Sequence, residues 1–219
     1  MSITLFSILS LGFVLGIKHA IEPDHVIAVS TIASKSKKLW QSTLAGVFWG
    51  IGHTLTLFIV GIILIIMKDE ISAKISMSLE FLVGIMLVYL GIMNIISFRE
   101  KKQHTHSHVS SLENKYPYLK STAIGLVHGL AGSAAMVLLT LTTVQTTWEA
   151  AIYIVVFGAG TILGMLCFTT VLGIPFVFSS RKYSVNRILA VIAGGISFAF
   201  GIYYMYNLGV TEGLFSLWI

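Results

Sequence analysis

Long apolar stretches with almost no charged residues constrain the fold of this chain more than any other feature. Six of them are long enough to cross a bilayer as a helix, which takes about 20 apolar residues. The expected spans are 3–32, 40–67, 77–98, 119–144, 149–178 and 185–208. Helices are the default in such segments because lipid cannot bond the exposed edges of strands. The sequence therefore predicts an all-α integral membrane protein with six transmembrane helices.

The low charge content and the first residues support this class. Only 11% of the residues are charged, about half the share found in soluble domains. The apolar stretch 3–17 lacks a basic start and a small-residue cleavage pattern, so we interpret it as part of the first span and not as a signal peptide. The single cysteine excludes an internal disulfide and a CxxC redox motif.

Basic residues alternate between the predicted loops and so predict the orientation of the chain. Eleven Lys and Arg residues lie in the loops after the first, third and fifth spans, and two lie in the loop after the second. Because basic loops stay in the cytoplasm, both termini are expected outside the cell membrane. The net charge of +5 follows from this asymmetry and does not indicate nucleic-acid binding. The outer side carries acidic residues that would attract cations: Asp69, Glu70, Glu80, Glu149 and Glu212.

Three groups of residues recur in the same order in the two halves of the chain. The pairs are Gly16-Ile17-Lys18-His19 with Gly125-Leu126-Val127-His128, Gly50-Ile51-Gly52 with Gly158-Ala159-Gly160, and Gly84 and Gly91 with Gly194 and Gly201. Since three spans per half is an odd number, the second half enters the membrane from the opposite side. This predicts two inverted three-helix repeats, 1–98 and 119–219, joined by the loop 99–118, as in secondary transporters. Packing of small residues between helices is the alternative explanation.

Ionisable residues lie inside three of the predicted spans, where they are energetically unfavourable and usually mark an ion site. They are His19, Glu22, Asp24, His25, His53 and His128. On a straight helix, at 100° per residue, those of the segment 19–25 would not converge. Pro23 lacks an N–H and clashes with the carbonyl of His19, so we expect the first helix to break there. A broken helix allows these side chains to gather around one ion.

The residue types in this cluster predict the class of ion. Imidazole and carboxylate together suit nickel, cobalt, zinc or copper(II) better than sodium or calcium. The cluster contains no cysteine and no paired methionines, which argues against copper(I). All six residues are therefore candidate metal ligands, and the metal is a transported substrate and not a prosthetic group. A capping role for Glu22 and structural roles for His53 and His128 are the alternatives.

The segment from Lys18 to His25, with the sequence KHAIEPDH, resembles the H-x4-D-H signature of the nickel/cobalt transporter (NiCoT) family. Gly52-His53-Thr54 and the segment 128–133, with the sequence HGLAGS, resemble the UreH-like branch of that family. The resemblance implies that His19, Asp24 and His25 carry metal recognition. It also implies a link to urease, a nickel enzyme. The better-studied members have an acidic second motif where this chain has His53, and they have eight spans.

The loop between the two halves contains three alternating histidines: His104, His106 and His108. Such a pattern can chelate a divalent ion, and a plain hydrophilic linker is the alternative. In the cytoplasm this loop would pass metal to or from the site, so a metallochaperone is a candidate partner. A second copy of the chain is another candidate, because the sequence leaves the oligomeric state open.

Three functions fit this sequence. Uptake of nickel or cobalt is favoured, because the membrane potential attracts a dication and the chain has no Walker A motif for ATP. Export of metal by proton antiport would use the same site. An intramembrane metalloenzyme is the third interpretation. It is disfavoured because the chain lacks the paired-histidine boxes of membrane desaturases and hydroxylases.

Overall fold

The computed structural model describes residues 3–67, 72–99, 118–144, 146–180 and 182–219. Within these ranges the chain forms helices and contains no strand. The elements, in chain order, are α1 (Ile3–His19), α2 (Pro23–Ala33), α3 (Leu39–Met67), α4 (Ala73–Arg99), α6 (Leu119–Thr143), α7 (Thr147–Ser179), α8 (Tyr183–Tyr206), η2 (Asn207–Thr211) and η3 (Leu214–Leu217). Most of the loop 99–118, with His104, His106 and His108, lies outside the described residues, as do Asp69 and Glu70.

The first predicted span is two helices, and the break is at Pro23. Proline is favourable at the first position of a helix, because that N–H has no intrahelical partner. Glu22 precedes it in an extended conformation, with φ −60° and ψ 145°. The axes of α1 and α2 differ by 55°. The helix break that the sequence predicted at this motif is therefore present.

By length and composition, fewer helices qualify as membrane spans in the described part of the chain than the six that the sequence predicted. Four helices there are long and apolar enough to cross a membrane, and a fifth span results if the bent pair α1–α2 counts as one. The helix α6 forms where the fourth span was expected.

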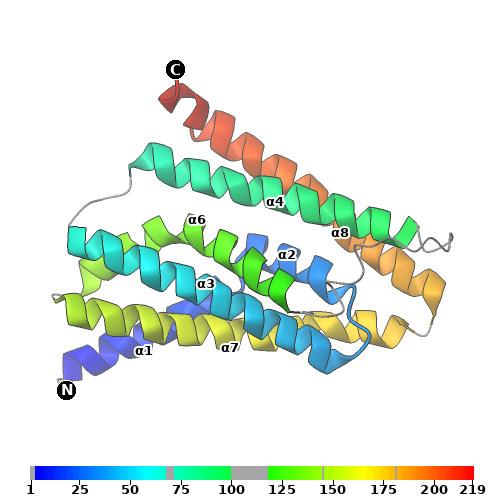
Figure 1. Cartoon of the computed structure of the whole chain (residues 1–219), viewed down its shortest axis with the longest axis horizontal. Helices are drawn as coiled ribbons and strands as arrows, with labels where there is room; N and C mark the ends of the chain where they lie inside the picture. The colour runs from blue at the N-terminus through cyan, green and yellow to red at the C-terminus, as the bar shows by residue number, and fades with distance from the viewer. Residues whose placement is uncertain (1–2, 68–71, 100–117, 145, 181) are drawn as a thin grey trace.

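The helices are arranged as a bundle with a separate pair beside it. The helix α3 packs against α6 and α7, and α1 packs along α7. The helices α4 and α8 pack mainly against each other and form a second layer (Figure 1). The short helix α2 contacts α4, α7 and α8, so it connects the bundle to the pair.

Glycines allow the bundle helices to touch backbone to backbone at matching places. A Cβ atom on Gly16 of α1 would overlap the carbonyl oxygen of Phe157 in α7. Likewise, a Cβ atom on Gly125 of α6 would overlap the carbonyl oxygen of Trp49 in α3. Gly16 and Gly125 occupy equivalent positions of the two sequence motifs, and Trp49 and Phe157 each precede a Gly-x-Gly motif. The contact of α1 with α7 thus repeats as the contact of α6 with α3.

The outer pair of helices shows the same reciprocity. A Cβ atom on Gly91 would lie 2.6 Å from the carbonyl oxygen of Gly194, and one on Gly194 would lie 2.9 Å from that of Gly91. Gly84 and Gly201 face each other in the same way, at 3.3 Å and 2.8 Å. Any larger residue would force α4 and α8 apart. These contacts fix the register of the two helices.

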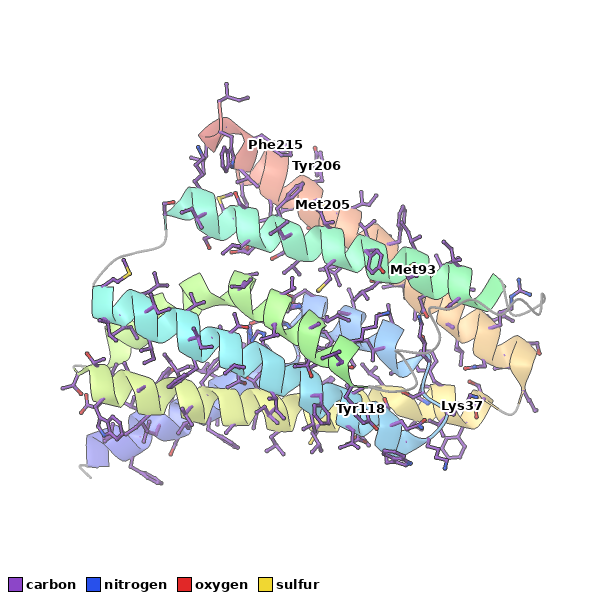
Figure 2. The ribbon with its side chains drawn as sticks, in the orientation of Figure 1. Lys37, Met93, Tyr118, Met205, Tyr206 and Phe215 are labelled. Carbon is purple, nitrogen blue, oxygen red and sulfur yellow. The ribbon has the colours of Figure 1, made fainter. Side chains whose placement is uncertain are left out.

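The outward surface of the bundle is apolar, as expected next to lipid. On α3, the side chains of Ile51, Leu55, Ile59 and Ile63 are exposed and follow one another at four-residue spacing, so they form one stripe. On the outer pair, Tyr206 of α8 is likewise exposed, and Figure 2 labels it. An apolar exposed face of this length indicates contact with lipid.

The two ends of the molecule differ in charge. The segment 34–38, which connects α2 to α3, lies at one end of the bundle, together with the end of α7, the start of α8 and the start of α6 (Figure 1). This end carries Lys35, Lys37, Lys38, Lys120 and Lys182. The start of α1 and the start of α4 lie at the opposite end (Figure 1). The start of α7, with Glu149, and the segment after α8, with Glu212, lie at that end too (Figure 1), against one basic residue in the described part of the chain, Lys74. We call the two ends the basic end and the acidic end.

Candidate metal site

The break between α1 and α2 places Asp24 and His25 at the start of a helix inside the bundle. His25 is 1% exposed, and Trp49 of α3 stacks on its ring with centroids 6.0 Å apart. Asp24, whose side chain is 18% exposed, lies beside it, with Oδ1 3.2 Å from Nδ1 of His25. As an acidic residue in the first turn of α2, Asp24 is also stabilised by the helix dipole.

His128 joins this pair from the other half of the chain. Its Nε2 lies 2.8 Å from Oδ2 of Asp24, and the rings of His25 and His128 are 4.0 Å apart. His128 is 2% exposed and reaches the site because Gly125, one turn earlier, allows α6 to lie directly against α3. Asp24 therefore has one imidazole against each of its two oxygens.

His19 and His53 form the other side of the cluster. Their Nε2 atoms are 3.1 Å apart, and which of them donates depends on the tautomers. Two nitrogens that bind one ion at about 2.1 Å, at right angles, would be separated by about 3 Å. The spacing of these nitrogens is therefore compatible with a shared metal ion.

Glu22 contacts the cluster from its exposed side. Its Oε2 lies 2.8 Å from Nδ1 of His19, the ring nitrogen that faces away from His53. The Glu22 side chain is 48% exposed. Such a contact fixes the tautomer and orientation of an imidazole ligand. The structure therefore places Glu22 against His19, on the side away from His53.

Two groups of side chains meet the spacing of metal ligands. His19, His25 and His53 form one, and Asp24, His25 and His128 form the other, with ligand atoms within 4.8 Å of one another in each. His25 belongs to both, so the two groups are one continuous cluster. In the described part of the chain, Nε2 of His25 and Nδ1 of both His53 and His128 are buried and have no hydrogen-bond partner. Such unpaired nitrogens are unfavourable unless they bind something.

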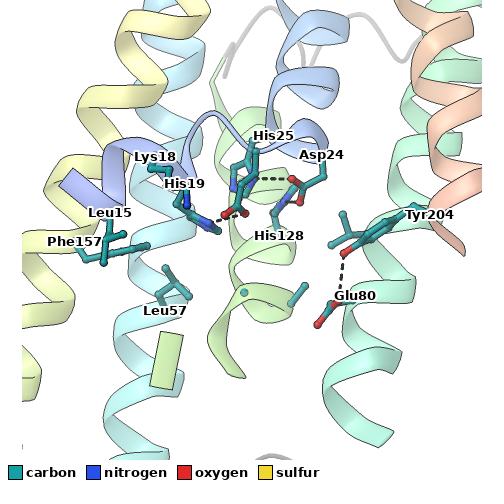
Figure 3. A pocket seen from close by; sticks show the side chains of 14 residues that line it. Leu15, Lys18, His19, Asp24, His25, Leu57, Glu80, His128, Phe157 and Tyr204 are labelled. Carbon is teal, nitrogen blue, oxygen red and sulfur yellow. Dashed lines mark hydrogen bonds and ion pairs between the residues drawn. The ribbon is translucent and has the colours of Figure 1, made fainter. Parts of the chain in front are cut away.

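A cavity of about 330 Å³ opens onto this cluster (Figure 3). His19, Glu22, Asp24, His25 and His128 line it. His53 does not, because it is fully buried behind His19.

The sequence interpretation missed part of the cavity wall. Glu80 of α4 and Tyr204 of α8 line it, opposite the histidines, and Figure 3 shows them joined by a hydrogen bond. The position of Glu80 near the start of the third predicted span indicated instead a place on the acidic outer side. Its carboxylate could have identified it as a cavity residue, because it lies inside a predicted span, as the other candidate ligands do. Lys18 also lines the cavity, but an ammonium group does not coordinate a metal.

The sequence of this chain is similar to those of known proteins along most of its length. A family model, NicO, described as high-affinity nickel-transport protein, matches residues 5–165. The urease accessory protein UreH of Bacillus sp. (strain TB-90) is 62% identical over 99% of this chain and 98% of its own length. A protein of Methanocaldococcus jannaschii named for nickel/cobalt efflux is 28% identical over 88% of this chain and 89% of its own length. No solved structure matches.

Proposed function

Since this chain belongs to the NicO family of nickel transporters, we propose that it takes up Ni²⁺ through the cluster built on Asp24 and His25. The family match confirms the resemblance that the sequence motifs indicated, and the apolar helices are those of a multi-pass membrane protein. The family is one of transporters and not of enzymes. The metalloenzyme interpretation is therefore set aside.

The observation that carries the proposal is the cluster itself. Four histidines and one aspartate, from α1, α2, α3 and α6, meet beside a cavity within a bundle of apolar helices. In the proposed site, His19, His25, His53, His128 and Asp24 bind the ion, and Glu22 orients His19. Nitrogen ligands with a single carboxylate favour Ni²⁺ or Co²⁺ over Mg²⁺ and Ca²⁺. With only one carboxylate, the site can also release its ion.

The proposed architecture is a pair of inverted three-helix repeats. In this arrangement α6 is the fourth of six spans, and α1–α2, α3 and α4 correspond to α6, α7 and α8. The reciprocal contacts of Gly16 with Phe157 and of Gly125 with Trp49 support it, since a pseudo-two-fold axis would exchange them. Inverted repeats of this kind place the substrate site near the midplane, where they meet.

The proposed direction is inward. The relative that is 62% identical is named as a urease accessory protein. Urease is a nickel enzyme, so cells that make it need nickel in the cytoplasm. A dication that enters against an interior potential of −100 mV gains about 4.6 kcal/mol, at about 2.3 kcal/mol per charge. This gradient can drive uptake without ATP.

Transport by the purified protein tests this proposal. The protein is reconstituted into liposomes that contain a metal-sensing dye, and Ni²⁺, Co²⁺, Zn²⁺ and Mn²⁺ are added in turn. We expect a protein-dependent signal with Ni²⁺ or Co²⁺, accelerated by a negative interior potential, and little signal with Mn²⁺. Equal rates in protein-free liposomes, or a preference for Mn²⁺, would contradict the proposal.

Export is the second candidate, because one relative is named for nickel/cobalt efflux. An exporter coupled to protons would move metal into liposomes whose interior is acidic and would stop when the pH gradient is abolished. A transporter driven by potential would respond to the potential instead. Imposing the pH gradient and the membrane potential separately therefore distinguishes proton-coupled export from potential-driven uptake.

A further inference from the structure

Glu80 is a carboxylate of the outer helix pair that the proposed metal site does not use. It lies seven residues after the start of α4, about 10 Å along the helix axis from the acidic end. It lines the same cavity as Asp24 and the histidines. Ionisable groups at such depth are energetically unfavourable and usually mark an ion path.

The contacts of Glu80 leave most of its oxygen lone pairs free. The hydroxyl of Tyr204 donates to Oε2 at 3.3 Å, and the hydroxyl of Ser76 donates to Oε1 at 3.3 Å. A carboxylate has about four acceptor positions, so about two remain for a cation or its water. The described residues contain no Lys or Arg within ion-pair distance of it.

The close packing of α4 on α8 holds this group in place. Glu80 precedes Gly84 by one turn, and Tyr204 follows Gly201 by one turn. Gly84 and Gly201 face each other at backbone distance. The hydrogen bond between Glu80 and Tyr204 is therefore built into the register of two closely packed helices.

The other end of the same helix pair has a matching contact that carries no charge. In the proposed repeat, where Gly84 corresponds to Gly194 and Gly91 to Gly201, Ala190 matches Glu80 and Asn94 matches Tyr204. Nδ2 of Asn94 donates to the carbonyl oxygen of Ala190 at 2.9 Å, and Oδ1 of Asn94 accepts from Ser34 at 2.9 Å. Asn94 is uncharged and buried, so this contact carries no charge and is not accessible to a cation. The carboxylate is present only at the contact nearer the acidic end.

We propose that Glu80, with Tyr204, is a second binding station for the divalent cation, between the acidic end and the histidine cluster. The inference rests on the proposed function. One carboxylate and a hydroxyl offer hard oxygen ligands, which leave a transition-metal ion largely hydrated and exchange it readily. The ion then passes across the cavity to the imidazoles, which bind it more tightly. The station concentrates the cation and does not select nickel.

Two variants of Glu80 and one matched control test this station. Glu80→Gln removes the charge, and Glu80→Asp keeps it. Glu212→Gln, as the control, removes an exposed carboxylate that is bonded to Asn207 and lies outside the cavity. Each protein is assayed for Ni²⁺ influx into dye-loaded liposomes over a range of concentrations. Each is also titrated with Ni²⁺ in detergent to measure equilibrium binding.

We expect Glu80→Gln to raise the half-saturating Ni²⁺ concentration for influx about tenfold, while the tightest equilibrium binding stays within about twofold of the unmodified protein. Glu80→Asp should stay within about threefold in both assays, and Glu212→Gln should match the unmodified protein. If the Gln variant does not give monodisperse protein, Glu80→Ala replaces it with the same expectation.

Two results would overturn the station. In one, Glu80→Gln or Glu80→Ala leaves the concentration dependence of influx unchanged. In the other, the variant loses the tightest Ni²⁺ binding, which would make Glu80 part of the histidine site. Failure of the proposed function looks different, because the unmodified protein would then neither bind nor transport Ni²⁺.

Discussion

His128 and Asp24, 104 residues apart in the sequence, meet with Nε2 2.8 Å from Oδ2. This contact joins the second half of the chain to the broken helix of the first half. It also completes the environment of Asp24, whose other oxygen lies against His25. The candidate site therefore depends on both halves of the molecule.

We predict that His128→Ala weakens equilibrium Ni²⁺ binding by at least about tenfold, the smallest loss typical of a group that only orients a metal ligand, because His128 also offers a ligand nitrogen. A titration of the purified protein with Ni²⁺ measures this. His128→Gln can still donate to Asp24 but has no imidazole, so it should recover little of the affinity, and full recovery would show that His128 only orients Asp24. Unchanged affinity in His128→Ala would show that this histidine does not take part.

The backbone contacts of the glycines make a prediction about stability. Gly125→Ala would force a Cβ atom into the carbonyl of Trp49, whereas Gly195→Ala meets no atom within 4 Å. We expect Gly125→Ala to destabilise the protein by about 1–3 kcal/mol, as overpacking does, and Gly195→Ala to change stability by less than about 0.5 kcal/mol. Thermal unfolding in detergent compares the two. Equal melting temperatures would contradict the close packing of α3 and α6.

The loop histidines should contribute less than the buried ones. Replacement of His104, His106 and His108 together by Ala is predicted to slow metal capture at low Ni²⁺ concentration but to leave the maximal influx rate within about twofold. Chelating histidine tracts can raise the local metal concentration without forming the transport site. Complete loss of influx in well-folded protein would give the loop an essential role.

The orientation of the chain can be tested with reporters. We expect a fusion after Ile219 to be active only with a reporter that works outside the cytoplasm, because the basic loops stay inside. A fusion in the loop 99–118 should give the opposite pattern. A cytoplasmic signal from the fusion after Ile219 would invert the proposed topology.

The sequence was informative about the site because charged and imidazole groups stand out in apolar spans. The helix break followed from Pro23, which cannot continue the hydrogen bonding of α1. The distance between His128 and Asp24 could not be predicted, since it depends on how closely α6 approaches α3. Glu80 was missed because a carboxylate near the start of a span resembles a surface charge, and only the packing of α4 on α8 turns it toward the cavity.

The apolar stretches located the helices, and α6 forms where the fourth span was expected. The size of the bend between α1 and α2, 55°, could not be predicted. Neither could the division of the helices into a bundle and a separate pair. Both depend on contacts between residues that are far apart in the sequence.

Nickel influx by the Asp24→Asn protein tests the central claim most directly. Asn keeps the size of the side chain but removes the negative charge that the metal and two histidines share. Glu22→Gln is the matched control, because it removes a half-exposed carboxylate of the same motif, while its amide oxygen can still accept a hydrogen bond from Nδ1 of His19 and keep that ring in place. Both variants are reconstituted at equal density in dye-loaded liposomes. The account predicts that Asp24→Asn loses at least about 90% of the Ni²⁺ influx while Glu22→Gln keeps more than half, and near-normal influx by Asp24→Asn would contradict it.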